Sequence, residues 1–232
     1  MIIKPATKED LNKIAKCHIA AFPNSVTSLF GVGFIAQMLQ WYLSAPNKFI
    51  FWIEEDTNCV GYCGGLVMDG SDAYGSASGM TQFGFGAAAK VMLRKPWLLF
   101  HPEIRARYPF IITNVKRRIS KIFGHSEKPI SIKPIEPHNT GLTAGLVVIG
   151  VHPSQHKKGI GSLLQQEFER KAKQMGATQM QLSVRVENAQ AISSYKKNGW
   201  VIIEDQKIAY LMTKNIITGF TLNLDDVFKD LD

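Results

Sequence analysis

The sequence predicts an α/β fold in which a mixed sheet carries helices on both faces. Three observations predict it. Strand-like and helix-like patterns alternate along the 232 residues, with one long interruption. The stretch 142–151 has no charged residue, which is typical of a central strand that is covered on both faces. A glycine-bearing turn, HKKGIG at 156–161, joins that strand to a helix pattern.

The first 68 residues predict a strand, two helices and a pair of strands. Residues 2–5 form the expected first strand, and Thr7 is the expected N-cap of the first helix, followed by acidic residues that suit the helix dipole. Residues 49–54 and 59–66 predict paired strands around the turn Asp56-Thr57-Asn58. The apolar faces of the two helices are Leu11, Ile14, Ala15, His18 and Phe22, then Phe34, Ile35, Met38, Leu39 and Tyr42.

Residues 70–141 are predicted to be an insertion, because the patterns before and after them belong together. The segment holds eleven basic and four acidic residues, a net charge of +7 within a chain whose formal net charge is +8. Residues 87–100 predict a helix, and 114–123 are short, basic and partly apolar. The positive field of the protein therefore belongs to this segment.

The last part of the chain predicts a helix, a strand, a second helix and a terminal hairpin. Gly176 is the expected C-cap of the first of these helices, and Asn188 the expected N-cap of the second. The expected ranges are 161–175 and 189–197 for the helices, 179–184 for the strand, and 200–204 with 207–213 for the hairpin.

The composition narrows the class of protein. No run of 18 apolar residues and no secretory signal pattern is present, so we expect a cytoplasmic protein. Three cysteines, Cys17, Cys59 and Cys63, fit a reducing compartment. Cys59 and Cys63 have too few further ligands nearby for a metal site, so we expect buried thiols and no metal.

The glycine-bearing turn is a candidate phosphate site. Amide groups at a helix start have no partner within the helix, and the helix dipole adds partial positive charge there. Glycine lets such donors approach a phosphate, while Lys157 and Lys158 add charge. The turn matches neither the P-loop nor the dinucleotide fingerprint. By itself a Gly-x-Gly before a helix is more often only a tight turn than a phosphate site.

The residues downstream make the pattern more specific. At Val151-His152-Pro153, then 156–161, then Asn188 to Ala191, Tyr195 and Gly199-Trp200, the sequence resembles the GCN5-related N-acetyltransferase (GNAT) family. That family has Val-x-Pro, then Arg/Gln-x-x-Gly-x-Gly/Ala opening a helix, then Asn-x-x-Ala, a tyrosine and Gly-Phe. The resemblance is close over residues 142–213 and weaker over 1–68. It implies a mixed, mostly antiparallel sheet with a long insertion before a central, splayed strand.

The resemblance implies acetyl-CoA as co-substrate. The strand end at Ile149, Gly150 and Val151 would bind the pantetheine arm and the thioester carbonyl, where a preset amide lowers the barrier. Tyr195 would be the general acid that protonates the departing thiolate. Asn188 would bind near the pantetheine arm or orient its helix. The pyrophosphate would be held by His156, Lys157, Lys158, Gly159, Ile160, Gly161 and Ser162.

Two departures from the family pattern remain. His156 stands where the family has Arg or Gln; Gln155 is an adjacent substitute, or His156 acts through its backbone. The strand at 142–151 lacks the family's glutamate base, which leaves Glu54, Glu55, His152 and His138 as candidates, or direct binding of a neutral amine. His18 is expected to be a packing histidine. The loop from Phe22 to Ser25, with Ser28 and Gly31, either lines the acceptor site or only connects two helices.

The predicted function is N-acetyl transfer from acetyl-CoA to a primary amine of a small or carrier-linked acceptor, with an amino sugar as one option. The alternative is a non-catalytic CoA-binding module that docks a partner through the basic insertion. That insertion is a solvated surface, a field for an anionic acceptor, or a contact with anionic membrane, since Trp97 and Phe100 accompany Lys90, Arg94 and Lys95. Nucleic-acid binding is not expected, because no recognised motif is present. The terminal hairpin and the apolar part of the insertion are candidates for a homodimer contact.

Overall fold

The computed structural model describes residues 1–69, 76–105, 112 and 141–216. Within these residues the chain forms one seven-stranded sheet with the strand order β1-β2-β3-β4-β5-β7-β6. The strands are β1 (Ile2–Pro5), β2 (Lys48–Glu55), β3 (Asn58–Asp69), β4 (Leu142–Val151), β5 (Ala177–Arg185), β6 (Val201–Asp205) and β7 (Ala209–Asn215). All neighbours are antiparallel except β4 and β5, which are parallel, so the predicted mixed, mostly antiparallel sheet is confirmed.

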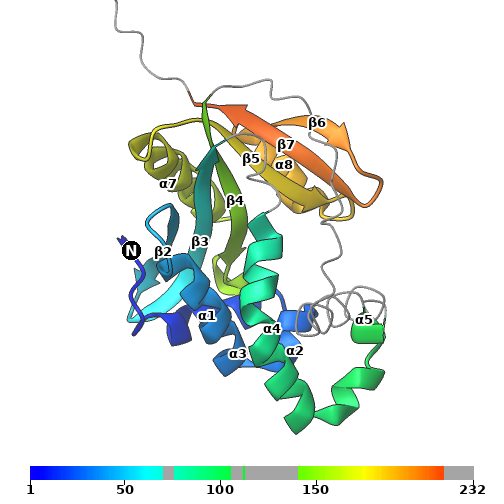
Figure 1. The fold of residues 1–232 in the computed structure, drawn as a ribbon. Coiled ribbons are helices and arrows are strands. Elements are labelled where there is room, and N and C mark those ends of the chain that lie inside the picture. Colours follow the sequence, from blue (N-terminus) through cyan, green and yellow to red (C-terminus); the bar gives the residue numbers. More distant parts are fainter. Residues whose placement is uncertain (70–75, 106–111, 113–140, 217–232) are drawn as a thin grey trace, which may run out of the picture.

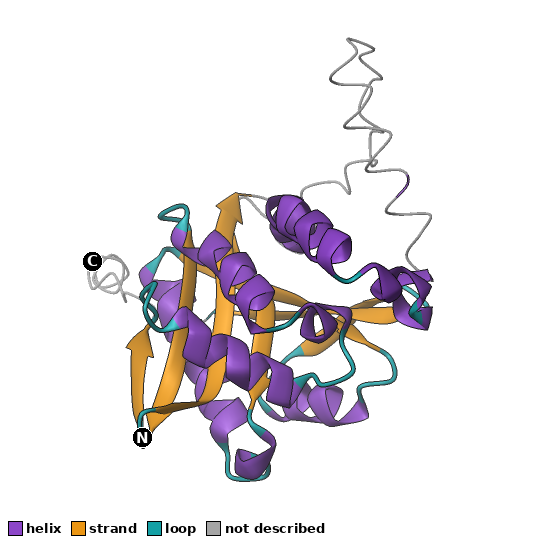
Figure 2. Ribbon diagram, turned by 90° about the horizontal axis from the view of Figure 1, so that it is seen from below, coloured by secondary structure: helices purple, strands orange, loops and turns teal. Residues whose placement is uncertain are grey.

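Helices cover both faces of the sheet, as predicted (Figures 1 and 2). One face carries α1 (Leu11–Ala21), α2 (Val26–Phe30), α3 (Val32–Leu39), the 3₁₀ turn η1 (Gln40–Leu43) and α4 (Ser76–Arg94). The other face carries α7 (Ile160–Gln174) and α8 (Ala189–Lys197). Short elements complete the described chain: η3 (Pro96–Phe100), α5 (Pro102–Arg105) and η4 (Pro153–Gln155).

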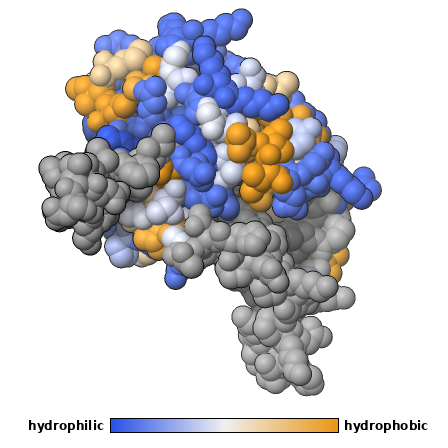
Figure 3. Space-filling view, turned by 90° about the horizontal axis from the view of Figure 1, so that it is seen from above, coloured by the Kyte–Doolittle hydropathy of each residue, from blue (hydrophilic) through white to orange (hydrophobic). Residues whose placement is uncertain are grey.

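Two hydrophobic cores lie on the two faces. Trp52 and Tyr62 lie in the core under α1 and α3, whereas Phe168 and Met180 lie in the core under α7. Cys59 belongs to the first core and Cys63 to the second, and both are free, buried thiols. No helix within the described residues combines the length and the hydrophobicity that crossing a bilayer requires. On the face shown in Figure 3, hydrophilic side chains separate the apolar areas from one another.

The start of α1 differs from the prediction. The helix begins at Leu11 rather than after Thr7, and Asp10 occupies its N-cap position. The Asp10 carboxylate accepts hydrogen bonds from the Thr7 amide and the Thr7 hydroxyl, both at 3.0 Å. The acid that was expected inside the first turn therefore closes a separate turn that leads into the helix.

The helices near and within the basic segment also differ in extent. The loop expected at 22–31 contains α2, whose N-cap is Ser25. The helix expected at 87–100 is two elements, because α4 begins at Ser76 and Pro96 opens the 3₁₀ turn η3. Ala87 of α4 and Leu98 of η3 pack into the same core as α1 and α3. The segment 114–123 lies outside the described residues. Within the described part of the predicted insertion, the helical elements with given bounds are α4, η3 and α5.

Candidate functional site

The glycine-bearing turn opens α7, as the sequence predicts. Gly159 is the N-cap residue and has a left-handed backbone, with φ of +82°. Lys157 also has a positive φ, of +63°, which is uncommon for a residue with a side chain. Both residues lie in the turn that leads into α7, and the backbone amides of such a turn can form a concavity that favours anions.

The first amides of α7 are available to a ligand. No side chain caps the helix at Gly159, and the regular hydrogen bonds of α7 begin with the Leu163 amide, which donates to the Gly159 carbonyl at 3.0 Å. The amides of Ile160, Gly161 and Ser162 precede it and have no acceptor within the helix. A Cβ atom placed on Gly159 or on Gly161 would meet no protein atom within 4 Å. The space in front of the turn is therefore open at the two positions where a diphosphate would approach.

Gln155, just before the turn, and His156, its first residue, already form hydrogen bonds within the protein. The His156 amide donates to the Pro153 carbonyl at 3.2 Å, and its Nε2 donates to the Val151 carbonyl at 3.2 Å. Gln155 is buried, and its Nε2 donates to Glu55 at 2.6 Å. Both side chains thus fasten the turn to the sheet, so Gln155 is not placed as the substitute phosphate ligand, and the His156 amide is already used.

A polar clasp that the sequence did not reveal joins α7 to α8. Asn198, which follows α8, donates from Nδ2 to the Ser162 hydroxyl at 3.1 Å and to the Ser194 carbonyl at 2.8 Å. Gln165 of α7 donates to the Ser194 hydroxyl at 3.0 Å. Because the Ser162 oxygen accepts from Asn198, its proton is left to be donated toward the open space. The asparagine beside the family-like Gly-Trp pair was the only sequence signal of this clasp.

The neighbouring strands β4 and β5 separate next to this turn. Their pairing runs only from Leu142 with Ala177 to Gly145 with Gln181, and β4 continues to Val151. A register shift on β4 opposite Gly64 and Gly65 of β3 bends the strand at that point. The predicted splay is confirmed. Backbone groups of β4 beyond Gly145 that face β5 therefore have no partner from that strand.

Tyr195 lies on α8, on the face of the sheet that also carries α7. It is buried in the same core as Ile149, and its ring packs edge-on against Trp200, with the ring centroids 5.9 Å apart. Burial raises the pKa of the Tyr195 phenol, and the nearby thiol of Cys63 raises that pKa further. Since Cys63 pairs with Ile149 across β3 and β4, this phenol lies close to the splayed strand and stays protonated at neutral pH.

Asn188 is the N-cap of α8, as predicted. Its side-chain oxygen accepts from the Ala191 amide at 3.1 Å. This oxygen fixes the start of the helix that carries Tyr195, two turns further along. The side-chain nitrogen of Asn188 is left for a contact with a pantetheine arm, which stays a prediction.

The acidic candidates for a general base are held elsewhere. Glu54 lies on β2, separated from β4 by β3, and pairs with Lys4 at 2.7 Å and Lys13 at 3.6 Å. The hydrogen bond from Lys4 lowers the Glu54 pKa, with both lysine charges contributing, which makes this carboxylate a weak base. Glu55 accepts the hydrogen bond from Gln155.

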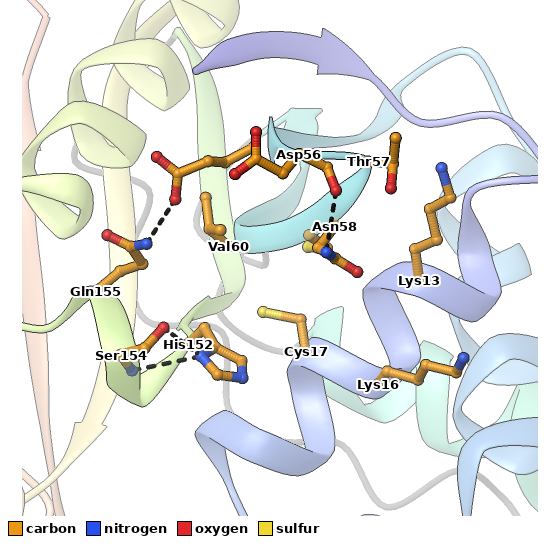
Figure 4. Close-up of a pocket in the computed structure, with 12 residues that line it drawn as sticks. Lys13, Lys16, Cys17, Asp56, Thr57, Asn58, Val60, His152, Ser154 and Gln155 are labelled. Carbon is orange, nitrogen blue, oxygen red and sulfur yellow. Dashed lines mark hydrogen bonds between the residues drawn. The ribbon is translucent and has the colours of Figure 1, made fainter.

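The histidine candidates lie at the end of β4 or beyond the described chain. His152 accepts from the Ser154 amide at 3.3 Å and is hydrogen-bonded to the Ser154 hydroxyl at 2.8 Å. It lines a cavity of about 560 Å³ between α1 and the β2–β3 turn, with Cys17 and Val60 on the other walls (Figure 4). His138 lies outside the described residues. Among the described residues, the predicted bases Glu54, Glu55 and His152 are thus each engaged in hydrogen bonds with other residues of the chain.

A partly buried histidine lies on the face of the sheet opposite to α7 and α8. His18 is hydrogen-bonded through Nδ1 to the Tyr62 hydroxyl and through Nε2 to the Thr27 hydroxyl at 3.0 Å. Tyr62 pairs with Gly150, where a Cβ atom would lie 2.6 Å from the Tyr62 ring and 3.1 Å from Phe22. The prediction that His18 is a satisfied packing residue is confirmed, and Gly150 is needed because two aromatic rings cover it.

The burial of His18 predicts a pH dependence of stability. Burial lowers the His18 pKa from 6.5 to about 4, so the unfolded chain binds the proton more readily. This contribution to stability is complete above pH 6.5 and is lost as the pH falls toward 4. Between pH 8 and pH 5 the wild type should lose about 2 kcal/mol more unfolding free energy than His18→Gln. Urea unfolding at the two pH values measures this difference, and equal losses in the two proteins would refute the assignment.

Comparisons with known proteins agree with these features. Residues 121–200 match the model of the "Acetyltransferase (GNAT) family". The comparison with curated proteins gives no match. Among solved structures, Chaetomium thermophilum Naa20 in complex with a bisubstrate analogue has 21% identity and a TM-score of 0.51, over 93% of this chain and 87% of that one.

Two further solved structures resemble the chain over nearly its whole length. Ribosomal-protein-alanine N-acetyltransferase from Brucella melitensis has 13% identity and a TM-score of 0.53, over 93% of this chain and 99% of that one. PaiA N-acetyltransferase from Thermoplasma acidophilum, in complex with coenzyme A, has 13% identity and a TM-score of 0.51 over the same shares. At these identities the likeness establishes the fold.

Proposed function

We propose that this chain, which carries a GNAT acetyltransferase domain and uses acetyl-CoA, transfers the acetyl group to the primary amine of a small or carrier-linked acceptor. The observation that carries the proposal is the position of the glycine-capped start of α7, directly after the end of β4 where that strand has parted from β5. In this arrangement the start of α7 can bind the diphosphate of CoA, and the free edge of β4 can bind the pantetheine arm.

The turn and the first turn of α7 would hold the diphosphate. The amides from Lys157 to Ser162 supply donors, Lys157 and Lys158 supply charge, and the Ser162 hydroxyl supplies one further donor. The open space at Gly159 and Gly161 supports this fit, because a side chain at either position would intrude on it. The His156 side chain contributes by holding the end of β4.

The edge of β4 would bind the pantetheine arm and the thioester. Bound acetyl-CoA supplies an activated acetyl group, and negative charge develops on the thioester oxygen during transfer. Unpaired amides of Ile149, Gly150 or Val151 in a fixed strand can stabilise that charge without reorganising. Holding both reactants in place supplies much of the remaining acceleration.

Tyr195 would provide the proton for the departing thiol. Its raised pKa keeps the phenol protonated, so it can donate throughout the neutral pH range. Asn188 would support this role by fixing the start of α8. The acceptor amine would enter from the side of the sheet that carries α1 and α2, where Phe22 lies against Gly150. The excess of basic residues in segment 70–141 supports an anionic acceptor, such as a nucleotide-linked amino sugar.

An amine panel tests the proposal. We expect release of free CoA thiol when acetyl-CoA is combined with one class among amino sugars, polyamines and peptide N-termini. A nucleotide-linked amino sugar should react faster than the same sugar without its nucleotide, because the basic segment attracts the negative charge. If the protein binds CoA but no amine releases thiol, the chain is a CoA-binding module and the proposed reaction is wrong.

A further inference from the structure

The end of α4 and the turn η3 expose large apolar side chains. Leu93 is 83% exposed, Trp97 63% and Phe100 78%. A 3₁₀ helix has three residues per turn, so Trp97 and Phe100 lie on the same face of η3. Leu98 of η3 and Ile104 of the following helix α5 are buried in the core of α1 and α3. The turn is thus anchored from inside while its apolar outer face is held in solvent, which is typical of an interaction surface.

Positive charge lies beside these side chains. Lys90, Leu93 and Arg94 share one side of α4 by their i, i+3 and i+4 spacing, and Lys95 follows directly. The sequence from 73 to 102 contains no acidic residue. No carboxylate of the side chains that the structure describes lies within ion-pair distance of these three cations, so none of those side chains neutralises the charge of this surface.

A groove leads inward from the same cations. It has a volume of about 390 Å³ and lies between α3, with the residues just before it, and α4. Its interior is apolar and its rim is basic, which suits an amphiphile with an anionic head. The lining residues that matter here are Phe30, Phe34 and Val91 inside, and Lys90, Arg94 and Lys95 at the rim.

We propose that this α4-end surface, formed by Lys90, Leu93, Arg94, Lys95, Trp97 and Phe100, docks the protein on a bilayer that contains anionic phospholipid. The apolar residues enter the interfacial layer, where tryptophan is favoured, and the cations meet the lipid phosphates. The groove receives part of the acyl chain of one anionic lipid, whose head group stays at the basic rim. Figure 1 shows the end of α4 and α5 at the end of the molecule that lies away from β6 and β7. Docking does not depend on the proposed acetyl transfer.

Intrinsic fluorescence provides a direct test with the unmodified chain. Of the four tryptophans, Trp41, Trp52 and Trp200 are buried and Trp97 is exposed. Vesicles of phosphatidylcholine with about one-third phosphatidylglycerol should shift the emission to shorter wavelength and sediment the protein. Vesicles of phosphatidylcholine alone should do neither. Trp97→Phe should abolish the shift while the protein still sediments, whereas equal behaviour with both vesicles would overturn the proposal.

Matched variants separate a specific surface from general stickiness. Phe100→Ser should weaken vesicle binding about 10-fold, whereas Ile208→Ser, at a residue on the β6–β7 hairpin that is also 78% exposed, should not change it. The double variant Arg94→Gln with Lys95→Gln should weaken vesicle binding about 30-fold. The control double variant is Lys8→Gln, just before α1, with Lys16→Gln, on α1, and it should leave vesicle binding unchanged. Equal effects of test and control pairs would overturn the proposal. So would self-association that buries Trp97 without lipid, since a second copy would then be the partner.

Discussion

Tyr195→Phe should lower the rate of CoA thiol release by about 100- to 1,000-fold and leave the affinity for CoA unchanged, as expected when a general acid is removed. Phenylalanine keeps the ring that packs against Trp200, so the core under α7 should remain intact. The loss should fall on kcat, because the hydroxyl acts on the departing thiol rather than on binding. Steady-state thiol release, together with calorimetric titration of CoA, measures both quantities.

Tyr210→Phe is the matched control for this variant. Tyr210 lies on β7 and packs against the same core, but it belongs to none of the predicted site residues. Its loss of a hydroxyl should leave turnover within about twofold of the wild type. Full activity of Tyr195→Phe would show that another group, or water, protonates the thiol. A loss of CoA binding would instead assign Tyr195 to positioning.

The sequence predicted those parts of the site that are set by local chemistry. The strand at 142–151 has the predicted bounds, because a run without charge is closed by Gly141 before it and His152-Pro153 after it. The start of α7 was predicted to within one residue, and the Asn188 cap was predicted, since glycine permits the left-handed backbone at Gly159 and asparagine is a favoured N-cap residue. The splay followed from the family resemblance, as no residue pattern within either strand encodes it.

The contacts that the sequence did not predict join residues far apart in the chain. His18 meets Tyr62 and Asn198 meets Ser162 only because α1 packs on β3 and α8 lies beside α7. Either residue could have bonded locally, and no spacing rule relates the partners. Thr7 was misassigned for a related reason: threonine and aspartate both suit an N-cap, and three-dimensional packing selected the turn that places Asp10 at the helix start. The general base is therefore the hardest role to predict from sequence, because it depends entirely on where the side chain lies in the folded protein.

Gly161→Leu should weaken CoA binding by about 10- to 100-fold without weakening the fold, which tests the phosphate assignment independently of catalysis. Gly161 is the second residue of α7, and a Cβ atom there meets no protein atom within 4 Å. The family pattern admits alanine at this position, so a side chain larger than a methyl group is needed to obstruct the ligand. Leucine has a higher helix propensity than glycine and should leave the unfolding free energy unchanged or raise it by up to about 1 kcal/mol. Its side chain would enter the open space in front of the amides, where the diphosphate has to lie.

Gly86→Leu provides the control that makes this separation of folding from binding decisive. Gly86 lies within α4, where an added Cβ atom also meets nothing within 4 Å, so its effect on stability should be similar. Its effect on CoA affinity should be nil. Denaturant unfolding without ligand and calorimetric titration with CoA give the two quantities for each variant. Wild-type CoA affinity in Gly161→Leu would place the diphosphate away from this turn, because a side chain of that size in front of the first α7 amides would obstruct a ligand held by them.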